Sequence, residues 1–154
     1  MTWFQRALTA VGLAMKPDLT HPILGPMSLD IREGETAGLW TCWDHIETPR
    51  GPIEVHVLAS RSGPTEPQIA FFRDVCDKIH DIEADLKSFL EAEYFRNWAP
   101  NGTRHPLKWI GITLPVNGDR RERWDLTFET NNEQGNLLSV YFKDGAPAFV
   151  TVEG

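Results

Sequence analysis

The sequence contains few cysteines and lacks any long apolar segment. Its 154 residues include two cysteines, Cys42 and Cys76, which are too few for the disulfide framework of a small secreted domain. We therefore expect two buried free thiols and a cytoplasmic protein. No apolar run approaches the roughly 20 residues that a membrane-spanning helix needs, so the sequence predicts no membrane contact.

The N-terminal residues also lack the features of a secretory signal peptide. Arg6 is the only charged residue before a short apolar stretch, and no clear A-x-A cleavage site follows it. Apolar residues instead recur at helical spacing, which predicts a short N-terminal helix. They are Phe4, Leu8, Val11 and Met15.

No motif for a cofactor, a metal ion or a catalytic nucleophile is present. The chain contains no G-x-x-x-x-G-K-[ST] phosphate loop, no G-x-G-x-x-G dinucleotide loop and no G-x-S-x-G nucleophile turn. It also contains no H-E-x-x-H, no C-x-x-C and no EF-hand pattern. We therefore expect no cofactor, no metal ion and no catalytic residues, and a protein that is not an enzyme.

Positive charge is scarce. The formal net charge is −7, and residues 66–93 hold eight acidic but only three basic side chains. Nucleic-acid phosphates require clusters of Lys and Arg, so we expect no nucleic-acid binding. An acidic surface favours a basic protein partner, although a solvated helix face that only keeps the protein in solution would show the same pattern.

Residues 65–98 show the strongest helical pattern. Thr65 is followed by Gln68 at the capping-box spacing, and Pro67 lies in the first turn, where proline is tolerated. The helix should end near Trp98, before a Pro-Asn-Gly segment. One face is apolar, and its residues are Ile69, Phe72, Val75, Cys76, Ile79, Ile82, Leu86, Phe89 and Leu90.

The flank of this helix is acidic, with four aspartates at helical spacing: Asp74, Asp77, Asp81 and Asp85. Acidic and basic residues four positions apart predict two ion pairs on this flank, Asp74 with Lys78 and Glu83 with Lys87. Because solvated helix flanks commonly have this composition, we expect no metal ion here despite the neighbouring histidine.

Alternating apolar and polar residues predict a run of strands. They fall at 27–31, in a hairpin within 38–60, and at 108–116, 124–130, 137–143 and 146–152. The whole chain, residues 1–154, is expected to form one α+β domain. In it an antiparallel sheet of about six to seven strands packs one apolar face against the long helix. The other face is left to solvent or to a partner.

The turn before the last strand contains Asp144 and Gly145. A two-residue loop would place the apolar residues of the last strand on the face opposite to Val140. A three-residue loop, residues 143–145, pairs Val140 with Ala148 and keeps those residues on one face. Since a slip of one residue reverses every side chain, we expect the three-residue loop.

The segment GLWTCWDHIETPRGPIEVHVLAS, residues 38–60, reads as two strands around a Pro-Arg-Gly turn. Pairing Ile46 with Ile53 gathers the apolar side chains of both strands on the core face. The opposite face then carries two cross-strand pairs: Trp43 with His56, and His45 with Glu54.

This polar hairpin face has three open interpretations. Two histidines and a carboxylate could bind a metal ion or perform acid–base chemistry, although a hairpin face offers no pocket. They could instead form a polar ladder in solvent. The face could also be a contact surface, because aromatic residues such as Trp43 are favoured binding anchors.

The segments HPILGPMSLD (21–30), WDLTFET (124–130) and LLSVYFKDGAPAFVTVEG (137–154) resemble small bacterial domains encoded in polymorphic toxin loci. Those domains are commonly regarded as immunity proteins. The resemblance covers about two thirds of the chain, mainly as strand patterns and turns, and provides no catalytic residue to carry over. It implies a cytoplasmic binding protein that neutralises a cognate toxin.

The sequence therefore favours a non-enzymatic protein-binding module, an immunity protein with a basic toxin as its partner. The expected contact surfaces are the acidic helix flank (Asp74, Asp77, Asp81, Asp85) and the outer hairpin face (Trp43, His45, Glu54, His56). A small enzyme or a metal- or ligand-binding domain that uses His45, Glu54 and His56 is the alternative. A structural subunit of a larger assembly is a third interpretation, and the oligomeric state is left open.

Overall fold

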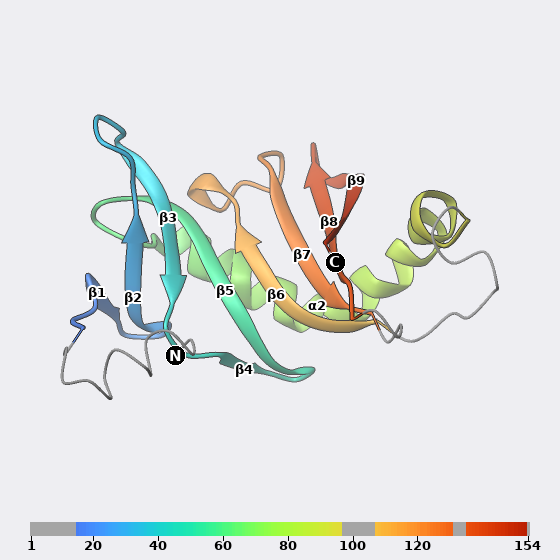
Figure 1. The fold of residues 1–154 in the computed structure, drawn as a ribbon, viewed down its shortest axis with the longest axis horizontal. Coiled ribbons are helices and arrows are strands. Elements are labelled where there is room, and N and C mark those ends of the chain that lie inside the picture. Colours follow the sequence, from blue (N-terminus) through green and yellow to red (C-terminus); the bar gives the residue numbers. More distant parts are fainter. Residues whose placement is uncertain (1–14, 97–106, 131–134, 154) are drawn as a thin grey trace.

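The structure is a computed structural model that describes residues 15–96, 107–130 and 135–153. The expected N-terminal helix (Phe4, Leu8, Val11) and the expected helix end at Trp98 therefore lie outside the described residues. The described part contains one long helix and a single sheet (Figure 1). Its α+β class is the predicted one.

The described residues form nine strands and three helical elements. The strands are β1 (Leu19–His21), β2 (Gly25–Asp30), β3 (Ala37–Cys42), β4 (Ile46–Thr48), β5 (Gly51–Ser60), β6 (Lys108–Leu114), β7 (Trp124–Glu129), β8 (Leu137–Lys143) and β9 (Ala146–Glu153). The helical elements are α2 (Glu66–Leu90), the π-helical turn η1 (Glu91–Phe95) and the 3₁₀ turn η2 (Val116–Gly118).

The nine strands of the described residues form one sheet in the order β1-β2-β3-β5-β6-β7-β8-β9, with β4 paired to β5. Nine strands exceed the six to seven expected. The expectation of a wholly antiparallel sheet is wrong at one pair, because β5 and β6 run parallel. The helix α2 lies between these two strands in the chain, and parallel neighbours need a long crossover of this kind.

The start of α2 follows its sequence signal. The Thr65 backbone N–H donates to Oε1 of Gln68 over 3.0 Å, as the capping-box spacing predicts. Gln68 is only 1% exposed. Its Nε2 donates to the backbone carbonyls of Leu58 (2.7 Å) and Pro115 (3.0 Å). One buried amide thus ties the first turn of the helix to β5 and to the segment after β6.

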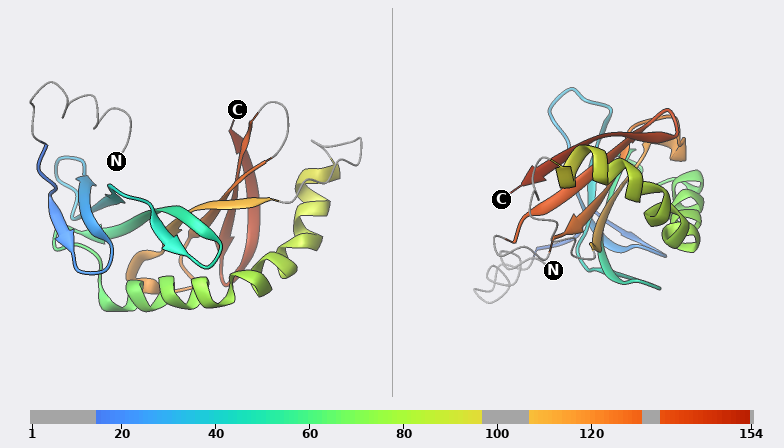
Figure 2. Two further views of the ribbon diagram at one scale, coloured as in Figure 1. Left: turned by 90° about the horizontal axis from the view of Figure 1, so that it is seen from below. Right: turned by 90° about the vertical axis from the view of Figure 1, so that its right-hand side faces the viewer.

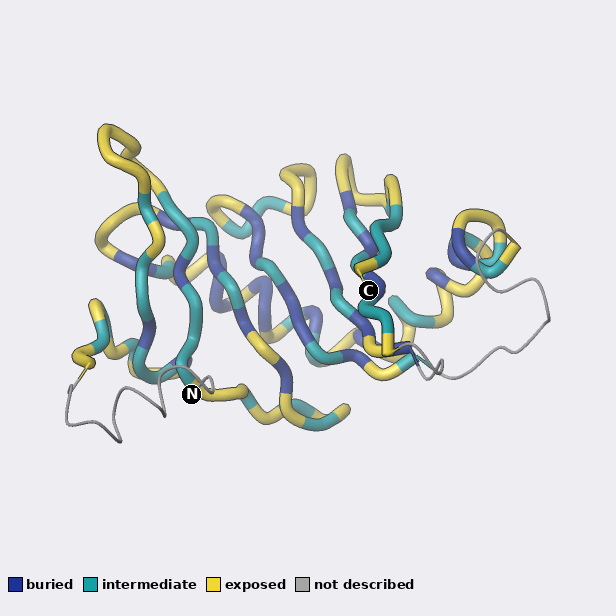
Figure 3. Tube along the Cα trace, viewed as in Figure 1, coloured by how far each residue is buried: buried dark blue, intermediate teal, exposed yellow. Residues whose placement is uncertain are grey.

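The core lies between α2 and one face of the sheet. Figure 2 shows the helix running along one side of the sheet, and Figure 3 shows the buried residues concentrated in the central strands and in the helix. The buried helix residues include Ile69, Phe72, Val75, Ile79 and Leu86. They pack with buried strand residues such as Trp40, Val57, Ile112, Leu126 and Val140. Among the described residues, no helix combines the length and apolar composition needed to cross a membrane.

The β8–β9 hairpin corrects the expected three-residue loop. The loop contains only Asp144 (φ 52°) and Gly145 (φ 79°), and positive φ at both central residues is typical of a two-residue type I′ turn. A bulge beside this loop then shifts the register by one residue, so that Val140 pairs with Val150. The apolar side chains still share a face, as expected, but a bulge and not a longer loop achieves it.

Strand β6 contains a second bulge. The register shifts between Trp109 and Gly111, and Trp109 is buried while Ile110 is only partly buried. The core side of β6 therefore carries Trp109, Ile112 and Leu114, and a strict alternation through Ile110 does not hold at this bulge. We call the sheet face opposite α2 the outer face, and the candidate site lies there.

Candidate functional site

The hairpin of β4 and β5 confirms part of the predicted pairing. Ile46 pairs with Ile53, as expected. Beyond it, the strand is interrupted at residues 43–45, and β3 continues the pairing with β5, with Thr41 opposite His56. The expected pairing of Trp43 with His56 is therefore wrong by two residues. A shift of two preserves the period of a strand, so the predicted faces are retained.

Trp43 lies against β2 and not against β5. Its indole Nε1 donates a hydrogen bond of 2.6 Å to Oγ of Ser28, and its backbone N–H donates to the carbonyl of Pro26 over 2.9 Å. The side chain is partly buried. Trp43 thus belongs to the outer face, but it anchors the segment 43–45 to its own sheet.

Glu54 lies between the two histidines. Nε2 of His45 is 3.7 Å from one carboxylate oxygen of Glu54, and Nε2 of His56 is 3.8 Å from the other. Both separations exceed hydrogen-bonding distance, and attraction requires a protonated imidazole. The structure brings these three predicted residues together, but in an open arrangement in which the side chains of His45 and Glu54 are 55% and 61% exposed. No group of three His, Cys, Asp or Glu residues in the described part is placed to hold a metal ion.

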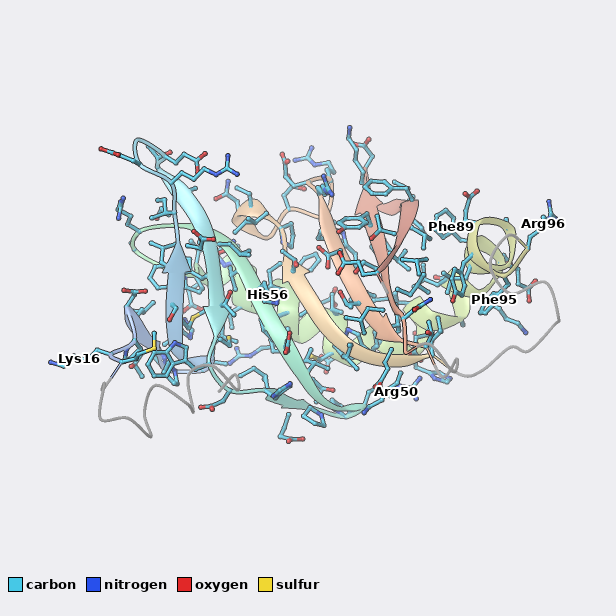
Figure 4. The ribbon with its side chains drawn as sticks, in the orientation of Figure 1. Lys16, Arg50, His56, Phe89, Phe95 and Arg96 are labelled. Carbon is cyan, nitrogen blue, oxygen red and sulfur yellow. The ribbon has the colours of Figure 1, made fainter. Side chains whose placement is uncertain are left out.

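A longer row of side chains crosses the outer face at the level of His56. Successive strand pairings align one residue from each of seven strands. Figure 4 shows His56 near the middle of the sheet, on the side away from α2. We call these residues the outer row: Ser28, Thr41, His56, Thr113, Asp125, Tyr141 and Phe149.

The centre of the outer row is half-buried and polar. Oγ1 of Thr41 lies 3.1 Å from Nδ1 of His56. Asp125 is half-buried two strands away, and burial raises the pKa of its carboxyl group. A hydrogen bond from Thr113 and the nearby His56 and Arg123 oppose this rise in the pKa. A carboxylate held in this way favours contact with a hydrogen-bond donor or a cation.

The β9 end of the row is aromatic. The rings of Tyr141 and Phe149 stack with centroids 4.5 Å apart, and the guanidinium of Arg123 lies 4.5 Å from the Tyr141 centroid. Phe149 is 42% exposed. Tyrosine and arginine are the residue types that most often carry binding energy at protein interfaces.

The opposite end of the outer face is apolar. Leu39 of β3 and Leu58 of β5 form a cross-strand pair. With Val116, which is 41% exposed, they line a hollow of about 330 Å³. The rim includes Asp30, Arg32 and Glu35. The outer face therefore has an apolar hollow and an aromatic cluster, with polar residues between them.

The acidic helix flank lies on the other side of the molecule. The carboxylate of Asp74 is held by Lys78, at 2.7 Å, and by Arg120, and their hydrogen bonds lower its pKa despite an opposing effect of burial. The remaining predicted residues, Asp77, Asp81 and Asp85, are exposed. The helix α2, which carries these aspartates, covers the inner face of the sheet (Figure 2), whereas the outer hairpin face lies on the other side.

A second cavity, of about 520 Å³, lies between α2 and the β4–β5 turn. Arg50 from that turn pairs with Glu83 of α2, so the expected pair of Glu83 with Lys87 is not the one formed. Figure 4 shows Arg50 and Phe95, two of the lining residues. The lining includes two basic residues, Arg50 and Lys87, and two acidic ones, Glu83 and Glu91, so it carries no net preference for either charge.

The two cysteines are free and partly buried. Burial, with a smaller effect of Asp44, raises the pKa of Cys42 to about 12. Burial, with a smaller effect of Asp77, raises that of Cys76 to about 11. Thiolates are therefore rare at neutral pH. The two thiols are unpaired, as expected, but each is partly buried and not fully buried as predicted.

Sequence reasoning missed the outer row and the hollow as functional features. Alternation along 124–130 does place Asp125 outside the core. The pairing of β5 with β6, which brings Asp125 near His56, leaves no local signal. A scan against protein-family models, a search of curated proteins and a search of solved structures each returned no match.

Proposed function

We propose that this protein is a non-enzymatic binding module that holds a basic protein partner against the outer face of its sheet. In the form that the sequence resemblance implies, it is a cytoplasmic immunity protein and the partner is its cognate toxin. The observation that carries the proposal is the outer row, a half-buried polar strip that ends at the stacked pair of Tyr141 and Phe149.

The outer row has the composition of a protein interface. Its centre supplies hydrogen-bonding groups at His56 and Asp125, and its end supplies rigid aromatic surface beside Arg123. Interfaces concentrate their binding energy in such aromatic and arginine residues, surrounded by polar contacts that exclude water. No other element of the described residues covers this face (Figure 1).

The acidic helix flank has a different role in this proposal. Asp77, Asp81 and Asp85 lie on the far side from the outer row, so they act on the partner through the long-range field and not by contact. A net charge of −7 attracts a basic partner and accelerates association at low ionic strength. In this proposal the outer face of the sheet makes the contacts with the partner, and the acidic flank of α2 raises the rate of association.

A capture experiment with paired variants tests this assignment. Tagged wild-type protein, an outer-face variant (Arg123→Ser with Phe149→Ser) and a helix variant (Asp81→Ser) are incubated with lysate of the native host at low and high salt. We expect one stoichiometric partner with the wild type and with Asp81→Ser, weakened by salt and lost with the outer-face variant. If Asp81→Ser loses the partner while the outer-face variant retains it, the proposal is contradicted.

The immunity role has its own test. Expression of the captured partner without this protein should arrest growth, and co-expression of the wild type should restore it. The outer-face variant should fail to restore growth although it folds, as judged by its thermal unfolding. A partner that is harmless when expressed alone would contradict the immunity role and leave only the binding role.

A second candidate function uses His45, Glu54 and His56. The observation that favours it is Glu54, whose two carboxylate oxygens each face an imidazole at 3.7 and 3.8 Å. Such a set could transfer protons or hold a small ligand, and it would hold a metal ion only if its side chains moved from the positions they have in this structure. A metal bound at one equivalent per chain in the purified protein, and lost in His56→Ala, would favour this function over protein binding.

A further inference from the structure

The hollow on the outer face is open, apolar at its base and charged at its rim. Leu39 and Leu58 form its base, and Val116 of η2 forms one wall with 41% of its surface exposed. Exposure of apolar residues to water is unfavourable, and a concave apolar patch at the surface is typical of a binding site. The hollow is therefore a site at which a partner would gain from burial.

The size of the hollow limits its occupant. Pockets that bury most of a drug-sized ligand range from about 300 to 1,000 Å³. At about 330 Å³, and open to solvent on one side, this hollow fits a single large side chain and its backbone. A bulky apolar side chain inserted into a small pocket is the usual anchor of a protein interface.

The charge of the rim indicates what stands next to that side chain. Asp30 and Glu35 contribute two negative charges, and Arg32 contributes one positive charge. All three residues are exposed, and none forms an ion pair with any other described residue. The rim is thus complementary to a basic residue flanking the anchor.

We infer that the hollow binds one large aliphatic or aromatic side chain of a protein partner, with a Lys or Arg of that partner beside Asp30 and Glu35. This inference rests on the proposed binding through the outer face, and it names the residue pair that the face recognises. Because Val116 lies on the short turn η2 and Asp30 at the end of β2, both can be changed without disturbing the core.

A library of random twelve-residue peptides displayed on phage tests the inference without knowledge of the partner. Selection on the wild-type protein should enrich peptides with a large apolar residue next to Lys or Arg. Val116→Asp should weaken an enriched peptide about tenfold or more, as expected for loss of an anchor. Charge reversal in Asp30→Lys with Glu35→Lys should remove the preference for a basic neighbour but retain the apolar residue.

The matched control is Ile23→Asp. Ile23 is 42% exposed, like Val116, and lies in the turn between β1 and β2, so this variant places the same charge on an apolar surface residue outside the hollow. Peptide binding should be unchanged in it. Enrichment of no motif, or equal weakening by Ile23→Asp and Val116→Asp, would overturn the inference.

The remaining outcomes separate the inference from the proposed function. Peptides whose binding is lost in Phe149→Ser but retained in Val116→Asp would overturn the anchor and leave the outer face as the binding surface. Self-association of the protein that Val116→Asp abolishes, measured by sedimentation, would show that a second copy of the chain occupies the hollow, and this too would overturn the inference.

Discussion

The side-chain amide of Gln68 donates a 2.7 Å hydrogen bond to the backbone carbonyl of Leu58, and through it the first turn of α2 is fixed to β5. The same Nε2 also donates to the carbonyl of Pro115. Gln68 is almost fully buried, so water has little access to replace these hydrogen bonds when the amide is removed. Gln68 thereby links three segments: the first turn of α2, strand β5 and the segment that follows β6.

Replacing Gln68 by Ala should cost much more than an ordinary helix substitution. Two carbonyls and the Thr65 N–H lose their partner, and we expect a loss of about 3 kcal/mol in the free energy of unfolding. Urea unfolding measures it. Arg73→Ala, an exposed change on the same helix, should stay within about 0.5 kcal/mol. Equal effects of the two variants would show that the Gln68 contacts contribute little.

The helix start illustrates what a single sequence can predict. Its signal is local, because Thr65, Pro67 and Gln68 all lie within four residues and the capping box is a contact between near neighbours. The apolar stripe of α2 is equally local. The additional bonds from Gln68 to Leu58 and Pro115 join segments 10 and 47 residues apart, and no spacing within the helix indicates them.

The sheet shows where such prediction ends. Alternation assigns each strand an inner and an outer face, and it does so correctly for Val57 and His56. It does not say which strands are neighbours, and the parallel pairing of β5 with β6 is decided by the packing of α2. The interruption at 43–45 contains Asp44, and the bulge of the last hairpin lies beside Pro147. Residues of these types occur at bends and bulges, but they do not determine the register.

In the candidate site, too, local features could be predicted from the sequence and contacts between distant strands could not. The grouping of His45, Glu54 and His56 was predictable from one hairpin, because the β4–β5 turn sets their register. The outer row requires six correct pairings in succession. The raised pKa of Asp125 in addition depends on its burial, which the alternation of a strand does not reveal.

The raised pKa of Asp125 predicts a specific pH dependence of stability. Because the pKa is higher in the folded protein than in the unfolded chain, the folded state binds more protons between the two values, and stability falls as the pH rises through this window. Asp125→Asn removes this loss and keeps an oxygen to accept from Thr113. We therefore expect the variant to gain stability relative to the wild type as the pH rises from about 4, the ordinary pKa of Asp, towards 7.

Thermal unfolding at several pH values measures this difference. Asp81→Asn, which removes one negative charge from the exposed helix flank, controls for the change in net charge. If Asp125→Asn and Asp81→Asn shift the melting temperature in parallel across the pH range, the effect belongs to net charge and not to the burial of Asp125.

Two glycines with similar backbones should differ in their tolerance of a side chain. Gly118 (φ 67°) and Gly145 (φ 79°) both have a left-handed conformation. A Cβ at Gly118 would collide with the backbone carbonyl of Pro67, whereas nothing lies near one at Gly145. We expect Gly145→Ala to cost about 1 kcal/mol from backbone strain alone, and Gly118→Ala to cost clearly more in chemical denaturation. Equal losses would mean that η2 moves away from α2 freely.

Charge reversal on the helix should change the speed of capture and not the lifetime of the complex. Asp77 and Asp81 are exposed residues of α2, and this helix lies on the side of the sheet away from the outer face (Figure 2). In Asp77→Lys with Asp81→Lys the attraction for a basic partner is reduced, and association should slow at low salt while dissociation stays constant. The wild type and the variant should converge as salt is raised, which surface plasmon resonance with the captured partner can follow. An unchanged association rate would remove the helix from the mechanism, whereas faster dissociation would place Asp77 and Asp81 in the interface itself.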